Sequence, residues 1–108
     1  IKMSFIKKFD MPGMEGEFFF TAKVENKTKK KISVYLKDVY LNDTNVMVGS
    51  AVPLDILPGK NGTQTWFTKY EGTGASKASD IKTIGFKIWV TDEHMKTLET
   101  TKNVEIKF

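Results

Sequence analysis

Apolar and polar residues alternate with a period of two along most of the chain, the pattern of strands that bury one face. In EFFFTAKVE, residues 17–25, the apolar side chains on one face are Phe18, Phe20, Ala22 and Val24. In IKTIGFKIWV, residues 81–90, they are Ile84, Phe86, Ile88 and Val90. The C-terminal run places Val104, Ile106 and Phe108 inward. No segment has a convincing helical period, although residues 75–78 suit one helical turn.

Two interruptions of the pattern predict irregular backbone. In KISVYLKDVYL, one unbroken parity would bury Asp38, whereas a shift of one residue buries Val39 instead, so we predict a bulge near Lys37 and Asp38. Pro58-Gly59 suits the two central positions of a type II turn, at a corner between two strands. No phosphate-binding loop is expected there, because the β-prone sequence TQTWF follows.

A strand is also expected over residues 46–56, where the even positions are apolar. Pro53 favours an edge location for it, since proline donates no ladder hydrogen bond. Seven to nine short strands joined by polar turns predict an all-β fold. The expected fold is a single antiparallel immunoglobulin-like β-sandwich over residues 1–108, with a small barrel as the alternative.

Composition excludes several functions. All 17 basic residues are lysines, and the absence of arginine argues against specific reading of nucleic acid. The absence of cysteine excludes disulfides, thiolate catalysis and cysteine-ligated metals. No apolar run has the length of a membrane span, and the sequence shows no signal-peptide pattern. The chain starts at Ile1, so we expect any leader, anchor or neighbouring domain to have been removed.

The lysine-rich segment after residue 25 is the first candidate binding site. Six lysines lie between Lys23 and Lys37, with only Glu25 opposing them. The candidate contact residues at the expected hairpin tip are Lys27, Lys29, Lys30 and Lys31. They suit a polyanion such as an anionic membrane or cell-wall polymer. The alternative is a solvated tip whose lysines prevent pairing between sheet edges.

Outward aromatic residues and one long loop are further candidates. Parity places Phe19, Tyr35 and Trp89 opposite the apolar faces of their strands, either as a binding platform for protein or carbohydrate or beneath a covering loop or terminus. Residues 69–80 form the longest stretch without a pattern. Tyr70 is the preferred contact residue there, although an ordinary crossover explains the loop equally well.

Catalytic and metal sites are not expected. The one histidine, His94, lies between acidic neighbours on a predicted turn, where adjacent side chains splay apart and do not converge on a metal. No Gly-x-Ser-x-Gly elbow accompanies it, and no spacing singles out a pair among the 13 acidic residues. We therefore expect neither a cofactor nor an enzymatic activity.

The order of several motifs resembles an uncharacterised immunoglobulin-like domain of extracytoplasmic proteins in low-GC Gram-positive bacteria. The motifs are VENKT, DVYLN, PGK and IKTIGFKI, and the resemblance covers about residues 17–108. Asp43 departs from it, since glycine is usual there. Such domains commonly follow a lipoprotein signal, or a zinc ribbon and a membrane helix, and have no associated enzymatic activity.

The resemblance implies a non-enzymatic, extracytoplasmic module of a larger surface protein, serving binding, adhesion or spacing. Its partners would be proteins or anionic cell-surface polymers, and it would reach a membrane only through a separate anchor. The alternative function is an inhibitor or regulator that presents a loop to a partner enzyme such as a protease. Two experiments distinguish these functions. Loss of polymer binding on charge reversal of the lysines would favour the surface module, and loss of protease inhibition on replacement of the 69–80 loop would favour the inhibitor.

Overall fold

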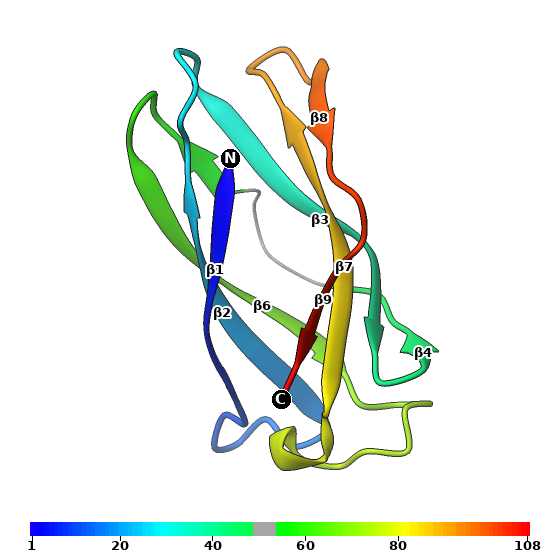
Figure 1. The fold of residues 1–108 in the computed structure, drawn as a ribbon. Coiled ribbons are helices and arrows are strands. Elements are labelled where there is room, and N and C mark those ends of the chain that lie inside the picture. The colour runs from blue at the N-terminus through cyan, green and yellow to red at the C-terminus, as the bar shows by residue number, and fades with distance from the viewer. Residues whose placement is uncertain (49–53) are drawn as a thin grey trace.

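The computed structural model describes residues 1–48 and 54–108, which form nine strands and one short 3-10 helix, η1 (Figure 1). The strands are β1 (Lys2–Phe9), β2 (Glu17–Glu25), β3 (Ile32–Leu41), β4 (Thr44–Asn45), β5 (Leu54–Ile56), β6 (Asn61–Lys69), β7 (Thr83–Thr91), β8 (Thr97–Thr100) and β9 (Val104–Lys107). The helix η1 spans Ala78–Asp80. No helix in the described residues is long and apolar enough to cross a membrane.

The strands form two antiparallel sheets. The three-stranded sheet has the order β1-β2-β6, and the six-stranded sheet has the order β4-β3-β7-β8, with β5 pairing with β3 and β9 with β7. The two sheets face each other in an elongated body of 41 × 26 × 23 Å. The predicted all-β antiparallel sandwich is therefore confirmed, and its strand number lies within the predicted range.

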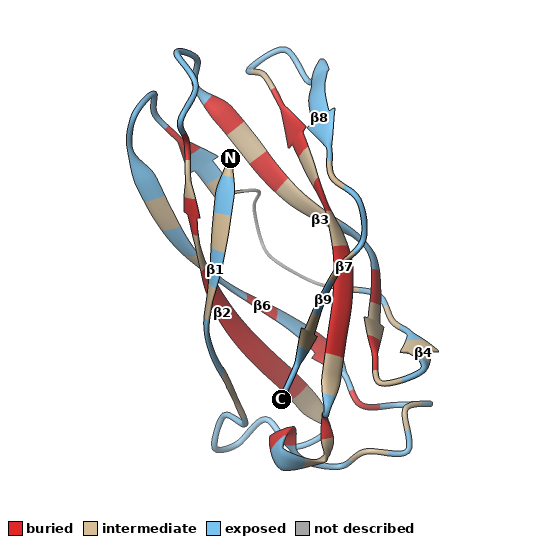
Figure 2. Ribbon diagram, in the orientation of Figure 1, coloured by how far each residue is buried: buried red, intermediate tan, exposed pale blue. Residues whose placement is uncertain are grey.

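The core lies between the sheets, where the buried faces of their long strands meet (Figure 2). Phe20 of β2 stacks on Phe86 of β7 with 6.4 Å between ring centroids, and on Trp66 of β6 at 5.8 Å. The alternation predicted for the two clearest strands is confirmed, since the inward residues of β2 and β7 are 3 % exposed or less. Burial of these large apolar side chains is the main favourable term in folding.

Both predicted backbone irregularities are present. The register between β3 and β7 shifts between Lys37 and Tyr40, Asp38 has a φ of 50°, and Val39 is buried. At the corner after β5, the amide of Lys60 donates to the carbonyl of Leu57 at 3.1 Å, and Gly59 has a φ of 70°. This corner carries the chain from the six-stranded sheet to the three-stranded one.

The structure differs from expectation in four places. The expected hairpin over residues 26–31 is wrong, because β2 and β3 belong to different sheets and this loop crosses between them. Within the strand expected over 46–56, residues 46–48 lie outside any strand, and the carbonyl of Met47 accepts a hydrogen bond from Thr68 of the facing sheet at 2.7 Å. Residues 54–56 of that range form β5, and the residues between lie outside the described part of the chain. Pro53 lies outside the described residues, but β5 does pair with β3 on the side away from β7. Phe108 is 45 % exposed rather than inward, since β9 ends at Lys107 and the ring packs on Phe5 of β1. The helical turn forms at Ala78–Asp80 rather than at 75–78.

Candidate functional site

The lysine-rich loop between β2 and β3, which crosses from one sheet to the other, is built on Asn26. This side chain is 1 % exposed, and its amide nitrogen donates to the carbonyls of Lys30, Ile56 and Leu57 at 2.7, 3.0 and 3.2 Å. Its oxygen accepts from the amide and the hydroxyl of Thr28 at 2.9 and 2.7 Å. One buried side chain thus holds the loop in a fixed shape and fastens it to the corner after β5.

Three loops meet at this end of the sandwich (Figure 1). They are residues 26–31, residues 57–60 and residues 92–96, and we call them the basic end. Its lysines are Lys27, Lys29, Lys30, Lys31, Lys60 and Lys96. The four lysines predicted as contact residues are all exposed, so the structure brings Lys27, Lys29, Lys30 and Lys31 together on one tip. Whether they bind a polyanion stays a prediction.

An acidic turn lies beside the lysine tip. A shallow depression of about 400 Å³ separates Lys29, Lys30 and Lys31 from the turn residues Asp92, Glu93 and His94. Asp92 accepts backbone hydrogen bonds from Lys96 at 2.9 Å and His94 at 2.8 Å, and these, with desolvation opposing them, hold its pKa below the usual value. The charge of nearby Lys30 acts in the same direction. Sequence patterns did not reveal that the acidic turn lies beside the lysine tip, because the two are far apart along the chain.

Six lysines at the basic end face two carboxylates, so a net positive charge remains there. The loops at the other end of the sandwich are residues 10–16, 42–43 and 70–82, and we call them the acidic end. Their carboxylates are Asp10, Glu15, Asp43, Glu71 and Asp80, against Lys77 and Lys82. The sandwich therefore carries opposite net charges at its two ends, which no local sequence window shows.

Tyr70 is not a surface contact residue, which corrects the sequence prediction. The side chain is 4 % exposed, its ring lies 5.8 Å from that of Phe18, and its hydroxyl donates to Asp10. The second oxygen of Asp10 accepts from the amide of Ala78 at 2.9 Å. Burial, and then the hydrogen bond to Asp10, raise the pKa of Tyr70. Tyr70 was misjudged because an unpatterned segment gives no sign of which residue turns inward.

The outward aromatic residues have different environments. Phe19 is 5 % exposed because its ring lies between those of Phe9 at 5.5 Å and Phe67 at 6.0 Å, its partners on neighbouring strands. Phe19 is therefore neither an exposed binding platform nor covered by a loop or terminus, the two alternatives expected from the sequence. Tyr35 and Trp89 are half-buried on the outer face of the six-stranded sheet, with 4.6 Å between ring centroids. The ammonium of Lys37 lies 4.5 Å from the Trp89 ring.

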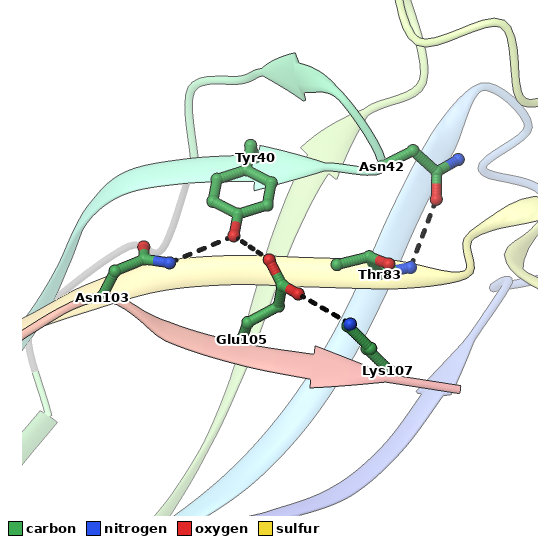
Figure 3. Close-up of polar contacts among 6 residues, drawn as sticks. All are labelled: Tyr40, Asn42, Thr83, Asn103, Glu105 and Lys107. Carbon is green, nitrogen blue, oxygen red and sulfur yellow. Dashed lines mark hydrogen bonds and ion pairs between the residues drawn. The ribbon is translucent and has the colours of Figure 1, made fainter.

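A polar network around Tyr40 was missed from the sequence. The Tyr40 hydroxyl donates to Glu105 of β9 at 2.5 Å and accepts from the amide nitrogen of Asn103 at 3.1 Å (Figure 3). The hydrogen bond to Glu105 raises the pKa of Tyr40 above its usual value. The ring reaches β9 by crossing Gly85 of β7, which is directly opposite Tyr40 in the ladder. A glycine inside an otherwise regular strand is the signal that could have indicated this close approach.

The remaining polar side chains, in the part of the chain that the structure describes, do not form a metal site, and Asn42 among them has a structural role. No group of three or more His, Cys, Asp or Glu side chains in the described residues is arranged to hold a metal ion. Asn42, at the end of β3, accepts hydrogen bonds from the amides of Lys82 and Thr83 at 2.8 and 3.2 Å. It thereby ties the β3–β4 turn to the start of β7 (Figure 3).

The fold and these surfaces define an antiparallel β-sandwich with one basic end. No protein-family model matches the chain, and no curated protein matches it. Among solved structures, the chain is similar to a FixG-related protein from Vibrio parahaemolyticus. The two are 24 % identical over 99 % of this chain and 93 % of the other, with a TM-score of 0.55. This likeness supports the fold alone.

Proposed function

We propose that this chain is a non-enzymatic module of a larger extracytoplasmic surface protein and that its basic end contacts anionic cell-surface polymers. The observation that carries the proposal is the lysine tip, where Lys27, Lys29, Lys30 and Lys31 are exposed on a loop fixed by Asn26. The fixed backbone holds the four lysines on one short loop. Their potentials then add at one end of the molecule.

The lysine composition suits a polyanion that is recognised by charge. An ammonium group acts as a hydrated point charge and lacks the planar fork with which arginine reads carboxylates, phosphates and bases. Contacts of this kind weaken as salt screens the charges, with a Debye length of about 10 Å at 0.1 M ionic strength. We therefore propose salt-dependent adhesion to an anionic membrane or cell-wall polymer, with no specific reading of nucleic acid and no cofactor.

The shape of the sandwich supports the spacer part of the proposal. Lys2 pairs with Glu25 beside the basic end, whereas the amide of Phe108 bonds to the carbonyl of Lys82 at the acidic end. The two termini therefore lie towards opposite ends of the 41 Å axis (Figure 1). Joined into a longer chain, such a domain would hold its neighbours apart along this axis and present the basic end at one junction.

Charge reversal tests the proposal directly. Wild-type protein should cosediment with vesicles containing anionic lipid and with purified anionic cell-wall polymer, and high salt should release it. The variant Lys29→Glu, Lys30→Glu, Lys31→Glu should lose this binding. The matched control reverses three exposed lysines at or next to the acidic end, Lys77 and Lys82 of its loops and Lys69 at the end of β6, for the same change in net charge. Equal loss in both variants would show that only overall charge matters and would contradict a role for the tip.

A loop-presenting inhibitor is the second candidate, because both ends of the 70–78 segment are fixed on Asp10. Tyr70 and Ala78 each bond to that carboxylate, and residues 71–77 span the interval between them. A segment held at both ends loses little entropy on binding. Saturable inhibition of a protease, abolished when residues 71–77 are replaced by a Gly-Ser linker, would favour this function. Absence of inhibition across serine, cysteine and metalloproteases would reject it.

A further inference from the structure

We propose that the outer face of the six-stranded sheet around Tyr40 binds a neutral saccharide, independently of the basic end. The site consists of the Tyr40 ring and the polar groups beside it on β3, β7, β9 and the turn before β9. The site lies on the broad face of the sandwich, away from the basic end. The contact to a sugar ring would come from stacking on Tyr40 and from hydrogen bonds to its neighbours.

The Tyr40 ring lies flat against the sheet because residue 85 is glycine. A Cβ atom at that position would lie 1.9 Å from Cζ of Tyr40 and 2.1 Å from Cε1, so the ring occupies the space of the missing side chain. Gly85 is buried beneath it, while Tyr40 stays half-exposed. One ring face therefore completes the sheet, as aromatic residues do over glycines in β-sheets, and the other is turned outward.

Hydrogen-bonding groups surround this ring in fixed positions. Glu105 and Asn103 hold the Tyr40 hydroxyl from β9 and the turn before it, and the second Glu105 oxygen lies 3.7 Å from the ammonium of Lys107 (Figure 3). On the bulge side, Lys87 lies 3.4 Å from Asp38. Two lysines and two carboxylates form ion pairs beside the ring, so the groups there are donors and acceptors whose charges cancel. Lys37, opposite Lys87 in the ladder, adds a positive charge on the Trp89 side of this face.

This combination suits a saccharide better than other ligands. A pyranose ring has an apolar face of C–H groups and a rim of hydroxyls, which match an aromatic face bordered by amide, carboxylate and ammonium groups. A polyanion would require a net positive field, which ion pairs whose charges cancel do not give. An apolar protein surface would require a wider hydrophobic patch than one tyrosine ring. Trp89 lies four residues along β7 from Gly85, about 13 Å away, and Tyr35 of β3 is its direct partner in the ladder. A longer saccharide chain would reach this pair of rings.

Titration with neutral hexasaccharides tests the proposal. Cellohexaose, chitohexaose and maltohexaose are added to isotope-labelled protein, and the amide NMR signals are followed to millimolar ligand. We expect at least one of them to shift the signals of Gly85, Asn103 and Glu105 and to leave those of residues 26–31 in place. If none of the three shifts the signals around Gly85, the proposal is overturned.

Variants of the site separate sugar binding from folding. Tyr40→Leu removes the ring and should weaken binding about tenfold or more. Asn103→Ala and Glu105→Gln leave the ring on Gly85 and should each weaken binding several-fold with the dispersed spectrum of the wild type retained. Unchanged affinity in all three variants would overturn the site. The triple lysine variant of the basic end should bind these sugars normally, so loss of sugar binding there would also contradict the proposal.

Discussion

Asn26 is the residue on which the proposed contact surface depends. Its buried amide supplies hydrogen bonds to a loop that joins two different sheets, and it bonds to both the 26–31 loop and the corner after β5. Tyr40 has a comparable role on the outer face, where its ring replaces the side chain that Gly85 lacks. In both places one polar or aromatic side chain supplies contacts that the main chain cannot make.

Asn26→Ala should therefore destabilise the protein strongly. The substitution removes the side-chain hydrogen bonds to the carbonyls of Lys30, Ile56 and Leu57 and the acceptor for Thr28 at a buried position, so we expect a loss of about 3 kcal/mol in the free energy of unfolding. Urea denaturation followed by tryptophan fluorescence measures it. Asn61→Ala, at an exposed position on β6, is the control and should change stability by less than about 0.5 kcal/mol. Equal effects of the two substitutions would contradict the role of Asn26.

Gly85→Ala should expel the Tyr40 ring from its place on β7. The new methyl group would overlap the ring, and we expect a loss of about 1–3 kcal/mol together with the hydrogen bond to Glu105. In a Tyr40→Ala background the same substitution should have little further effect. A double-mutant cycle by thermal denaturation measures the coupling, and additive effects would show that the ring and the glycine do not interact.

At the scale of elements, the bulge in β3 determines which residues enter the core. Two residues of β3 have no direct partner on β7, so the strand changes parity and Val39 replaces Asp38 on the inner face. The sequence predicted this bulge because burial of an unpaired carboxylate is unfavourable. The Pro58-Gly59 corner was predictable for a similarly local reason, since few residues other than glycine accept a positive φ.

Substitutions at Asp38 test the bulge. Its φ of 50° disfavours β-branched side chains, so Asp38→Val should lower the free energy of unfolding by about 1–2 kcal/mol. Asp38→Gly should be neutral or slightly stabilising, because glycine adopts this conformation freely and the ion pair with Lys87 is exposed. Equilibrium urea unfolding of the two variants measures the difference. A Val variant as stable as the Gly variant would place residue 38 in an ordinary extended conformation.

The loop of residues 70–78 should make stability sensitive to alkaline pH. The folded-state pKa of Tyr70 is raised, so its contribution is complete below the unfolded value of about 10 and is lost as pH rises through the folded value. Tyr70→Phe should be less stable at neutral pH by about 1–2 kcal/mol and should lose less stability above about pH 10. Unfolding free energies measured across this range decide the matter. Tyr35→Phe, which keeps Tyr70, should follow the wild-type profile.

Part of the fold and of the candidate site was predictable from local sequence. Strands such as β2 and β7 follow from alternation, and the lysine tip follows from a run of lysines at an expected turn. The path of residues 46–48 outside the sheet involves a hydrogen bond from Thr68 in the facing sheet, and the hydroxyl of buried Tyr70 bonds to Asp10, 60 residues away. Such pairings join distant segments, so no pattern along the chain indicates them.

At the scale of the whole molecule, the sandwich separates charge along its length. Lysines predominate at the basic end and carboxylates at the acidic end, while the charges of the two ion pairs beside Tyr40 cancel. An asymmetric charge distribution orients a protein as it approaches a charged surface. We therefore expect the module to meet an anionic polymer with its basic end first.

The salt dependence of binding to an anionic polymer tests this account most directly. The logarithm of the association constant of the wild type should fall steadily as the logarithm of salt concentration rises, since several lysines displace counterions together. The variant reversed at Lys29, Lys30 and Lys31 should bind far more weakly, whereas the variant reversed at Lys69, Lys77 and Lys82 should keep the wild-type slope. Binding that does not respond to salt, or that both variants lose alike, would contradict the account.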